Sequence, residues 1–213
     1  QPQAAVTWAR RYLAEGGTEA GVRVALVQAL HASGDLAGAA PEVLPLIEAA
    51  EAAGQTPPED QLKLLAFAQL KGGDEAGYAR TLERLVAHHP RPEYWADLLS
   101  RVSRRPGFAD RLQVDALRLA RRAGALEDAS EYLDLAQLAL QAGQPAEAVA
   151  VVDEGYAKGL LGKGPQAERH QRLKAGAAKA LADDRAALAA GEASARSEEH
   201  TSELQSRGLI SYA

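Results

Sequence analysis

Glycine-centred helix breakers recur along the chain at nearly constant spacing, and this regularity constrains the fold more than any other feature. Gly34, Gly73, Gly107 and Gly143 are separated by 39, 34 and 36 residues. A second set of Gly and Pro breakers lies between them, so the intervening segments are about 12 to 17 residues long, enough for three or four helical turns. Two helices in each period of about 35 residues is typical of stacked helical hairpins.

The composition favours helices over strands. Of the 213 residues, 47 are alanine and only 5% are aromatic. Alanine is the strongest helix former, whereas aromatic and β-branched residues favour strands, and no segment alternates apolar and polar residues with period two. The sequence therefore predicts an all-α fold with ten helices, over residues 3–15, 18–33, 36–53, 58–71, 74–88, 92–104, 108–123, 127–142, 145–158 and 165–191.

Local sequence also marks several helix ends. Asp74 is predicted to cap the helix over 74–88, because a short acidic side chain accepts hydrogen bonds from the free amides of a first turn. Thr56 and Glu59, with Pro at the first helical position, are predicted to form a capping box. A glycine closes most segments, as expected for a left-handed residue that stops a helix.

One hairpin matches a known repeat pattern. Five of its positions carry the large, apolar or small residue that the pattern W-x2-L-G-x2-Y…G-x4-A requires: Tyr132, Leu135, Ala136, Gly143 and Ala148. The segment resembles the tetratricopeptide repeat (TPR), and in particular the alanine-rich bacterial members of that family. Segment 61–90 is a second match, in which Tyr78 replaces a small residue. Segments 22–54 and 94–124 match more weakly.

The resemblance implies a fold and a domain organisation. It implies an α-α superhelix, a right-handed solenoid of about four to five TPR-like hairpins whose first helices line a concave face. Residues 18–159 would form this repeat array. Residues 1–17 would be the second helix of a truncated preceding repeat, and residues 160–195 the loop and terminal helix of a truncated next repeat.

The amino-acid composition of the chain changes at Arg196. Alanine, abundant up to Ala195, does not return until Ala213, and the string from Arg196 resembles the translation of a common sequencing-library adapter. We therefore expect residues 196–213 to be an adapter-derived tail rather than native sequence, and set His200 aside. The chain contains no Met and opens directly in helical material, which favours truncation at this end over a processed start.

Several classes of function are disfavoured. The absence of Cys excludes thiolate metal sites and Cys nucleophiles. A formal net charge of −5 disfavours binding to nucleic acid, and no apolar run reaches ~18 residues, so membrane insertion is not expected. The loop at Lys163 lacks the Ser or Thr of a phosphate-binding loop, and the neighbours His88 and His89 would point to different sides of a helix. We expect no enzymatic activity, no cofactor and no metal.

The leading hypothesis is a non-enzymatic scaffold that binds a protein or peptide partner through the concave face. The alternatives are a helical repeat fragment of a larger enzyme or cell-envelope assembly protein, and a structural spacer. The sequence does not choose between the bacterial cytoplasm and the periplasm. Projecting the repeat phase onto the first helices predicts these partner-binding residues: Gln28, His31, Lys63, Phe67, Tyr94, Asp97, Arg101, Arg104, Asp134, Gln137 and Gln141.

Within this set, Tyr94 and Arg101 are predicted to matter most. Tyrosine and arginine are enriched at binding hot spots, and groove arginines suit a carboxylate or an acidic peptide. Of the neighbours Tyr94 and Trp95, one is expected to pack between repeats and the other to be exposed. Replacing Tyr94 or Arg101 with Ala should then weaken partner binding by about 1–3 kcal/mol and leave stability nearly unchanged.

Overall fold

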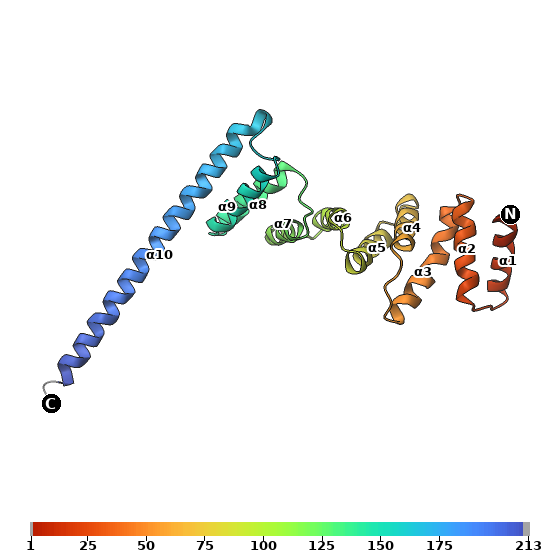
Figure 1. The fold of residues 1–213 in the computed structure, drawn as a ribbon, viewed down its shortest axis with the longest axis horizontal. Helices are drawn as coiled ribbons and strands as arrows, with labels where there is room; N and C mark the ends of the chain where they lie inside the picture. The colour runs from red at the N-terminus through yellow and green to blue at the C-terminus, as the bar shows by residue number, and fades with distance from the viewer. Residues whose placement is uncertain (1, 211–213) are drawn as a thin grey trace. The chain divides into compact units, whose positions relative to one another are not determined.

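The computed structural model describes residues 2–210, and within them the side chains of residues 3–19 and 21–196. Over this range the chain forms ten α-helices and two short 3-10 turns, with no strand (Figure 1). The helices are α1 (Pro2–Ala14), α2 (Ala20–Ala32), α3 (Leu36–Ala52), α4 (Glu59–Lys71), α5 (Glu75–His88), α6 (Pro92–Ser103), α7 (Gln113–Arg122), α8 (Ala129–Gln141), α9 (Pro145–Ala157) and α10 (Ala167–Ile210). The 3-10 turns Asp110–Leu112 and Gly164–Gln166 precede α7 and α10.

The all-α prediction is confirmed, and the helix boundaries differ mainly in two places. The predicted helix 108–123 begins instead with a 3-10 turn, and its α-helical part starts at Gln113. The last helix was predicted to end at 191, whereas α10 continues to Ile210 because Gly191 keeps a helical backbone and no Pro follows it. The side chains beyond Arg196 and residues 211–213 lie outside the described part, so the adapter origin of the tail stays a prediction.

The chain divides into two compact units, and the boundary between them passes through α7. The first unit comprises the residues up to Asp110 together with Leu119–Ala125, and the second comprises Arg111–Arg118 and the residues from Leu126 onward. In the first unit α1 to α6 pack in chain order, each helix on the next (Figure 1). In the second unit α8 and α9 pack as a hairpin, and α10 packs on both.

The core of the first unit is made by the apolar stripes of α2 to α6. Leu26 and Leu30 of α2 pack with Ala39 of α3 in one cluster. A larger cluster joins α3, α4, α5 and α6 through nearly fully buried side chains: Val43, Ile47, Leu62, Leu65, Leu82, Leu85 and Leu98. Each such Leu contributes about 1.5–3 kcal/mol by leaving water, so the stack of hairpins is held mainly by these stripes.

Two turns of the first unit have nearly the same geometry. Gly34 and Gly73 adopt left-handed φ values of +77° and +74°, which a side chain would strain. The following residues Asp35 and Asp74 then cap α3 and α5 by accepting hydrogen bonds from the amides of Gly38 and Gly77, at 2.9 and 2.8 Å. The predicted cap at Asp74 is therefore confirmed.

The predicted capping box at Thr56 is wrong. Helix α4 begins at Glu59, and the residue before it, Pro58, makes no side-chain cap. The carboxylate of Glu59 instead contacts Arg91 and Tyr94 from the next hairpin. The local sequence pattern assigned this carboxylate to the helix end, but it pairs with residues of the next hairpin.

The core of the second unit uses the positions that carry the TPR resemblance. Tyr132, Leu135 and Ala136 of α8 and Ala148 of α9 are fully buried. Gly155 of α9 lies under Leu161, where any side chain would collide with that leucine. Small residues therefore let α9 approach its neighbours closely.

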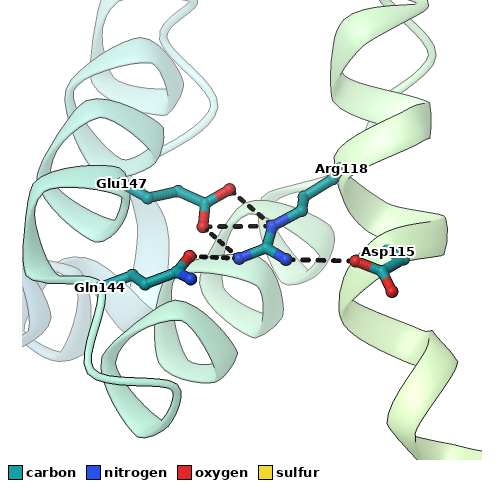
Figure 2. Close-up of polar contacts among 4 residues, drawn as sticks. All are labelled: Asp115, Arg118, Gln144 and Glu147. Atoms are coloured by element: carbon teal, nitrogen blue, oxygen red, sulfur yellow. Dashed lines mark hydrogen bonds and ion pairs between the residues drawn. The ribbon is translucent and has the colours of Figure 1, made fainter.

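A network centred on Arg118 ties the start of α7 to the start of α9 within the second unit (Figure 2). The Arg118 guanidinium donates to both carboxylate oxygens of Glu147, with Nε–Oε1 and Nη2–Oε2 distances of 2.9 and 2.6 Å. It also donates to the Asp115 carboxylate at 3.1 Å and to the Gln144 side chain. These hydrogen bonds, above all those to Glu147, hold the pKa of Arg118 above its ordinary value, so this side chain is a fixed cation.

Candidate functional site

The first unit contains an apolar groove with a volume of about 810 Å³, which we call the central groove. Its lining comes mostly from α2, α4, α5 and α6. Its deeper side is formed by Tyr78, Leu82 and Leu85, which belong to the core cluster. A groove of this size with a few polar side chains at its edge is typical of ligand sites.

Two large apolar side chains of α4 stand exposed in this groove. Phe67 is 43% exposed and Leu70 is 42% exposed, and both line the cavity. The Lys71 ammonium lies 5.6 Å from the centre of the Phe67 ring, which keeps a cation beside this aromatic face. Exposed apolar side chains that adjoin a cavity are typical of a binding surface rather than of a finished core.

One wall of the groove is a polar chain that links α5 to α6. The Tyr78 hydroxyl donates to the Asp97 carboxylate at 2.5 Å, and Arg101 Nε donates to the other Asp97 oxygen at 2.7 Å. Arg101 also donates to Glu75, and its guanidinium lies 4.4 Å from the centre of the Tyr78 ring. Burial, helped by Asp97, raises the pKa of Tyr78 to about 12, so this hydroxyl stays protonated and donates at neutral pH.

A second polar contact connects α4 to α6 at the edge of the groove. The Tyr94 hydroxyl donates to Glu59 at 2.5 Å, and Arg91 Nη2 donates to the other Glu59 oxygen at 2.7 Å. The hydrogen bond from Tyr94 lowers the pKa of Glu59, and the Arg91 charge adds to this effect. Burial, with the hydrogen bond to Glu59, raises the pKa of Tyr94 to about 12.

The contacts of Tyr94 and Trp95 differ from the expectation that one of them packs and the other is exposed. Both side chains are half-buried and pack against the larger core cluster of the first unit. The exposed aromatic in this region is Phe67 instead. The exposed aromatic side chain therefore belongs to α4 rather than to α6.

The structure brings together five of the eleven predicted binding residues. Those that line the central groove are His31, Lys63, Phe67, Tyr94 and Asp97. Gln28 lines an adjoining cavity of about 390 Å³ that shares His31 with the groove. The repeat phase projected from the glycine spacing thus selects residues of α2, α4 and α6 that face a common cavity.

The other predicted residues lie elsewhere. Arg101 and Arg104 line a separate cavity between α5 and α6, to which Asp97 also contributes. Asp134 lines a cavity of about 360 Å³ in the second unit. Gln137 and Gln141 lie on α8 of that unit, half-buried and exposed respectively.

Sequence reasoning missed other residues of the groove, including Leu70 and Tyr78. One signal for Tyr78 was available, because it departs from the small residue that the repeat pattern requires at its position. In the second unit the ring of His170 is buried, 4% exposed, and its Nδ1 accepts a hydrogen bond from the Gly162 amide at 3.0 Å.

The side chains that the structure describes include no group of three or more His, Asp or Glu arranged to hold a metal ion. His88 contacts Glu51 at 3.2 Å and His89 contacts the Pro57 carbonyl oxygen at 2.8 Å. Each histidine thus has a separate partner in the preceding hairpin and its loop. Over the same residues, no helix is both long and apolar enough to cross a membrane.

No protein-family model matches the chain, and no curated protein sequence matches it significantly.

Proposed function

We propose that the chain is a TPR-like, non-enzymatic scaffold that binds a protein or peptide partner in the central groove. The observation that carries the proposal is the exposure of Phe67 and Leu70 beside the cavity that α2, α4, α5 and α6 line. A stacked-hairpin protein gains nothing in stability from apolar side chains left in water. A partner that covers them would remove this apolar surface from water.

The groove favours an apolar side chain with polar groups on either side. Its deeper surface is Leu82, Leu85 and the Tyr78 ring, whereas Asp60 and Lys63 of α4 stand exposed at its edge. In interfaces of this kind, a few apolar or aromatic anchors supply most of the affinity, and the surrounding polar residues supply selectivity. We therefore infer a peptide segment whose apolar side chain lies against Phe67.

A displayed library of random peptides, selected on the purified protein, tests this proposal. A selected peptide is then titrated calorimetrically against the wild type, Phe67→Asp and Leu70→Asp. We expect each substitution to weaken binding about tenfold or more, because it places an unpaired carboxylate against the apolar ligand. Leu188→Asp is the matched control, since Leu188 is 62% exposed on α10 in the second unit.

Two results would contradict the proposal. One is that selected peptides bind the Phe67 and Leu70 variants as tightly as they bind the wild type. The other is that the library yields no peptide at all, which would favour a structural spacer.

A further inference from the structure

The cavity between α5 and α6 has a different chemistry from the central groove, and we call it the arginine pocket. Its volume is about 670 Å³, and four arginines line it: Arg80, Arg101, Arg104 and Arg105. Ala76 and Ala79 of α5 form part of its wall, so the space between the arginines is left open by small side chains.

One of the four arginines is already neutralised. Arg101 donates to Asp97 at 2.7 Å and to Glu75, and its guanidinium stacks on Tyr78. Two of the pocket's carboxylates, those of Glu75 and Asp97, are therefore paired with Arg101. Arg101 is therefore a structural member of the wall.

The other three arginines are exposed and unpaired. In the part of the chain that the structure describes, the side chains of Arg80, Arg104 and Arg105 make no hydrogen bond or ion pair. The pocket's carboxylates are Glu75 and Asp97, which pair with Arg101, and Glu83, which is unpaired among the described residues. Four arginines therefore face three carboxylates, so the pocket carries an excess of one positive charge in a chain whose formal net charge is −5.

The three arginines come from two places in the first unit. Arg80 belongs to α5, whereas Arg104 and Arg105 directly follow α6, where their backbone amides donate to the carbonyls of Arg101 and Val102 at 3.3 and 3.2 Å. A ligand that contacts all three must carry more than one anionic group. Each guanidinium presents a planar pair of donors that matches the two oxygens of a carboxylate.

We propose that the arginine pocket binds an acidic peptide segment, with neighbouring Asp or Glu carboxylates paired to Arg80, Arg104 and Arg105. Charge complementarity carries this assignment, together with a volume that accommodates several side chains. The lining of the pocket offers no aromatic ring for base stacking, which disfavours a nucleic acid. The proposal does not require the central groove to bind anything.

Fluorescence anisotropy with a labelled hexaglutamate peptide tests the proposal on the full chain. We expect saturable binding at about 0.05 M salt that weakens about tenfold or more at about 0.5 M salt, because exposed charges are screened. Arg104→Glu and Arg80→Glu should each weaken binding about tenfold or more by reversing one contact. Arg185→Glu is the matched control, because Arg185 is exposed on α10 of the second unit and is unpaired among the residues that the structure describes. This variant should bind within about twofold of the wild type.

Further measurements distinguish binding in the arginine pocket from binding in the central groove and from binding of phosphate. Phe67→Asp should bind hexaglutamate like the wild type, so failure of the groove proposal would leave this result intact. Melting temperatures of the arginine variants should match the wild type, because the replaced side chains have no partner to lose. Inorganic phosphate and a thymidine oligonucleotide should compete only weakly.

Three outcomes would overturn the assignment. The first is equal loss of hexaglutamate binding in Arg104→Glu and Arg185→Glu, which would mean that net charge alone drives binding. The second is the absence of saturable binding at low salt. The third is tighter binding of phosphate or the oligonucleotide than of hexaglutamate with the same dependence on Arg80 and Arg104, which would make the pocket a phosphate site.

Discussion

The Tyr94 hydroxyl donates a 2.5 Å hydrogen bond to the Glu59 carboxylate and so connects α6 to α4 across the edge of the central groove. The contact joins two residues that are 35 positions apart, which is one repeat period. It therefore couples neighbouring hairpins, and it makes Tyr94 a structural residue as well as a groove residue.

Tyr94→Phe should lower the free energy of unfolding by about 0.5–1 kcal/mol at pH 7, since it removes a partly exposed hydrogen bond and keeps the ring. Because the pKa of Glu59 is lowered in the folded state, the ionised carboxylate stabilises the fold at neutral pH, and this stabilisation is lost as the pH falls through the folded-state pKa. The difference between wild type and variant should thus shrink in acid. Urea unfolding at pH 7 and near pH 3 measures it, and a difference that grows in acid would contradict the assignment.

Alkaline titration should reveal Tyr78 and Tyr94 as late-ionising tyrosines. Both have a pKa of about 12 in the folded state against an ordinary value of 10. The unfolded chain therefore loses these protons first, so the stability that they contribute is complete below pH 10 and is lost as the pH rises toward 12. The ultraviolet absorbance of tyrosinate should rise with pH in an ordinary step near pH 10 and a late step near pH 12. Part of the late step should disappear in Tyr78→Phe and in Tyr94→Phe. A late step that is unchanged in both variants would contradict the assignment.

Arg101→Ala should destabilise the first unit, contrary to the expectation from sequence that stability would hardly change. The substitution leaves Asp97 and Glu75 without their arginine and removes the guanidinium from the Tyr78 ring. We expect a loss of about 1 kcal/mol, after allowance for solvent screening. Thermal melts compare it with Arg104→Ala, whose unpaired side chain should be dispensable. Equal melting temperatures for the two variants would mean that the Tyr78–Asp97–Arg101 chain does not stabilise the wall.

Arg118→Ala should destabilise the second unit by about 1–2 kcal/mol, because a bidentate pair with Glu147 and two further hydrogen bonds are lost together. Arg172→Ala is the matched control. Arg172 pairs with Glu168 at 3.7 Å on the exposed surface of α10, and such pairs contribute little, about 0.5 kcal/mol or less. Chemical denaturation followed by circular dichroism distinguishes the two, and similar losses would count against the network.

Deleting residues 196–213 should leave the melting temperature unchanged. The side chains of α10 from Ala182 to Arg196 are all exposed, so this part of the helix adds nothing to a core. The helical signal of circular dichroism should fall in proportion to the residues removed. A drop of several degrees in melting temperature would show that the tail packs on the protein.

The helices could be predicted because their determinants are local. Alanine content, apolar spacing and the breakers at Gly34 and Gly73 act within one turn or one hairpin. The cap at Asp74 depends only on the next three residues, and it was predicted correctly. The end of α10 was missed, because Gly191 carries a stop signal in sequence that the backbone does not use.

The site could be predicted only in part, because its decisive contacts are tertiary. Repeat phase placed His31, Lys63 and Phe67 at one cavity, since a period and a helical face are sequence properties. It could not show that the Glu59 carboxylate accepts a hydrogen bond from Tyr94 of α6 instead of capping the start of its own helix. Nor could it distinguish Arg101, which pairs with the carboxylates of Asp97 and Glu75, from Arg104, whose side chain is unpaired among the described residues. That distinction depends on which residues α5 and α6 bring face to face.

The turns at Gly34-Asp35 and Gly73-Asp74 agree in backbone angles, with φ and ψ of −82° and 70° at Asp35 and −82° and 74° at Asp74. Two joints of the same shape are interchangeable. Unequal crossing-over between their codons in the gene would delete or duplicate one whole two-helix unit and rebuild an identical joint each time. A chain built in this way changes length in steps of one hairpin, and each step adds or removes one segment of groove without redesign of the turns that flank it.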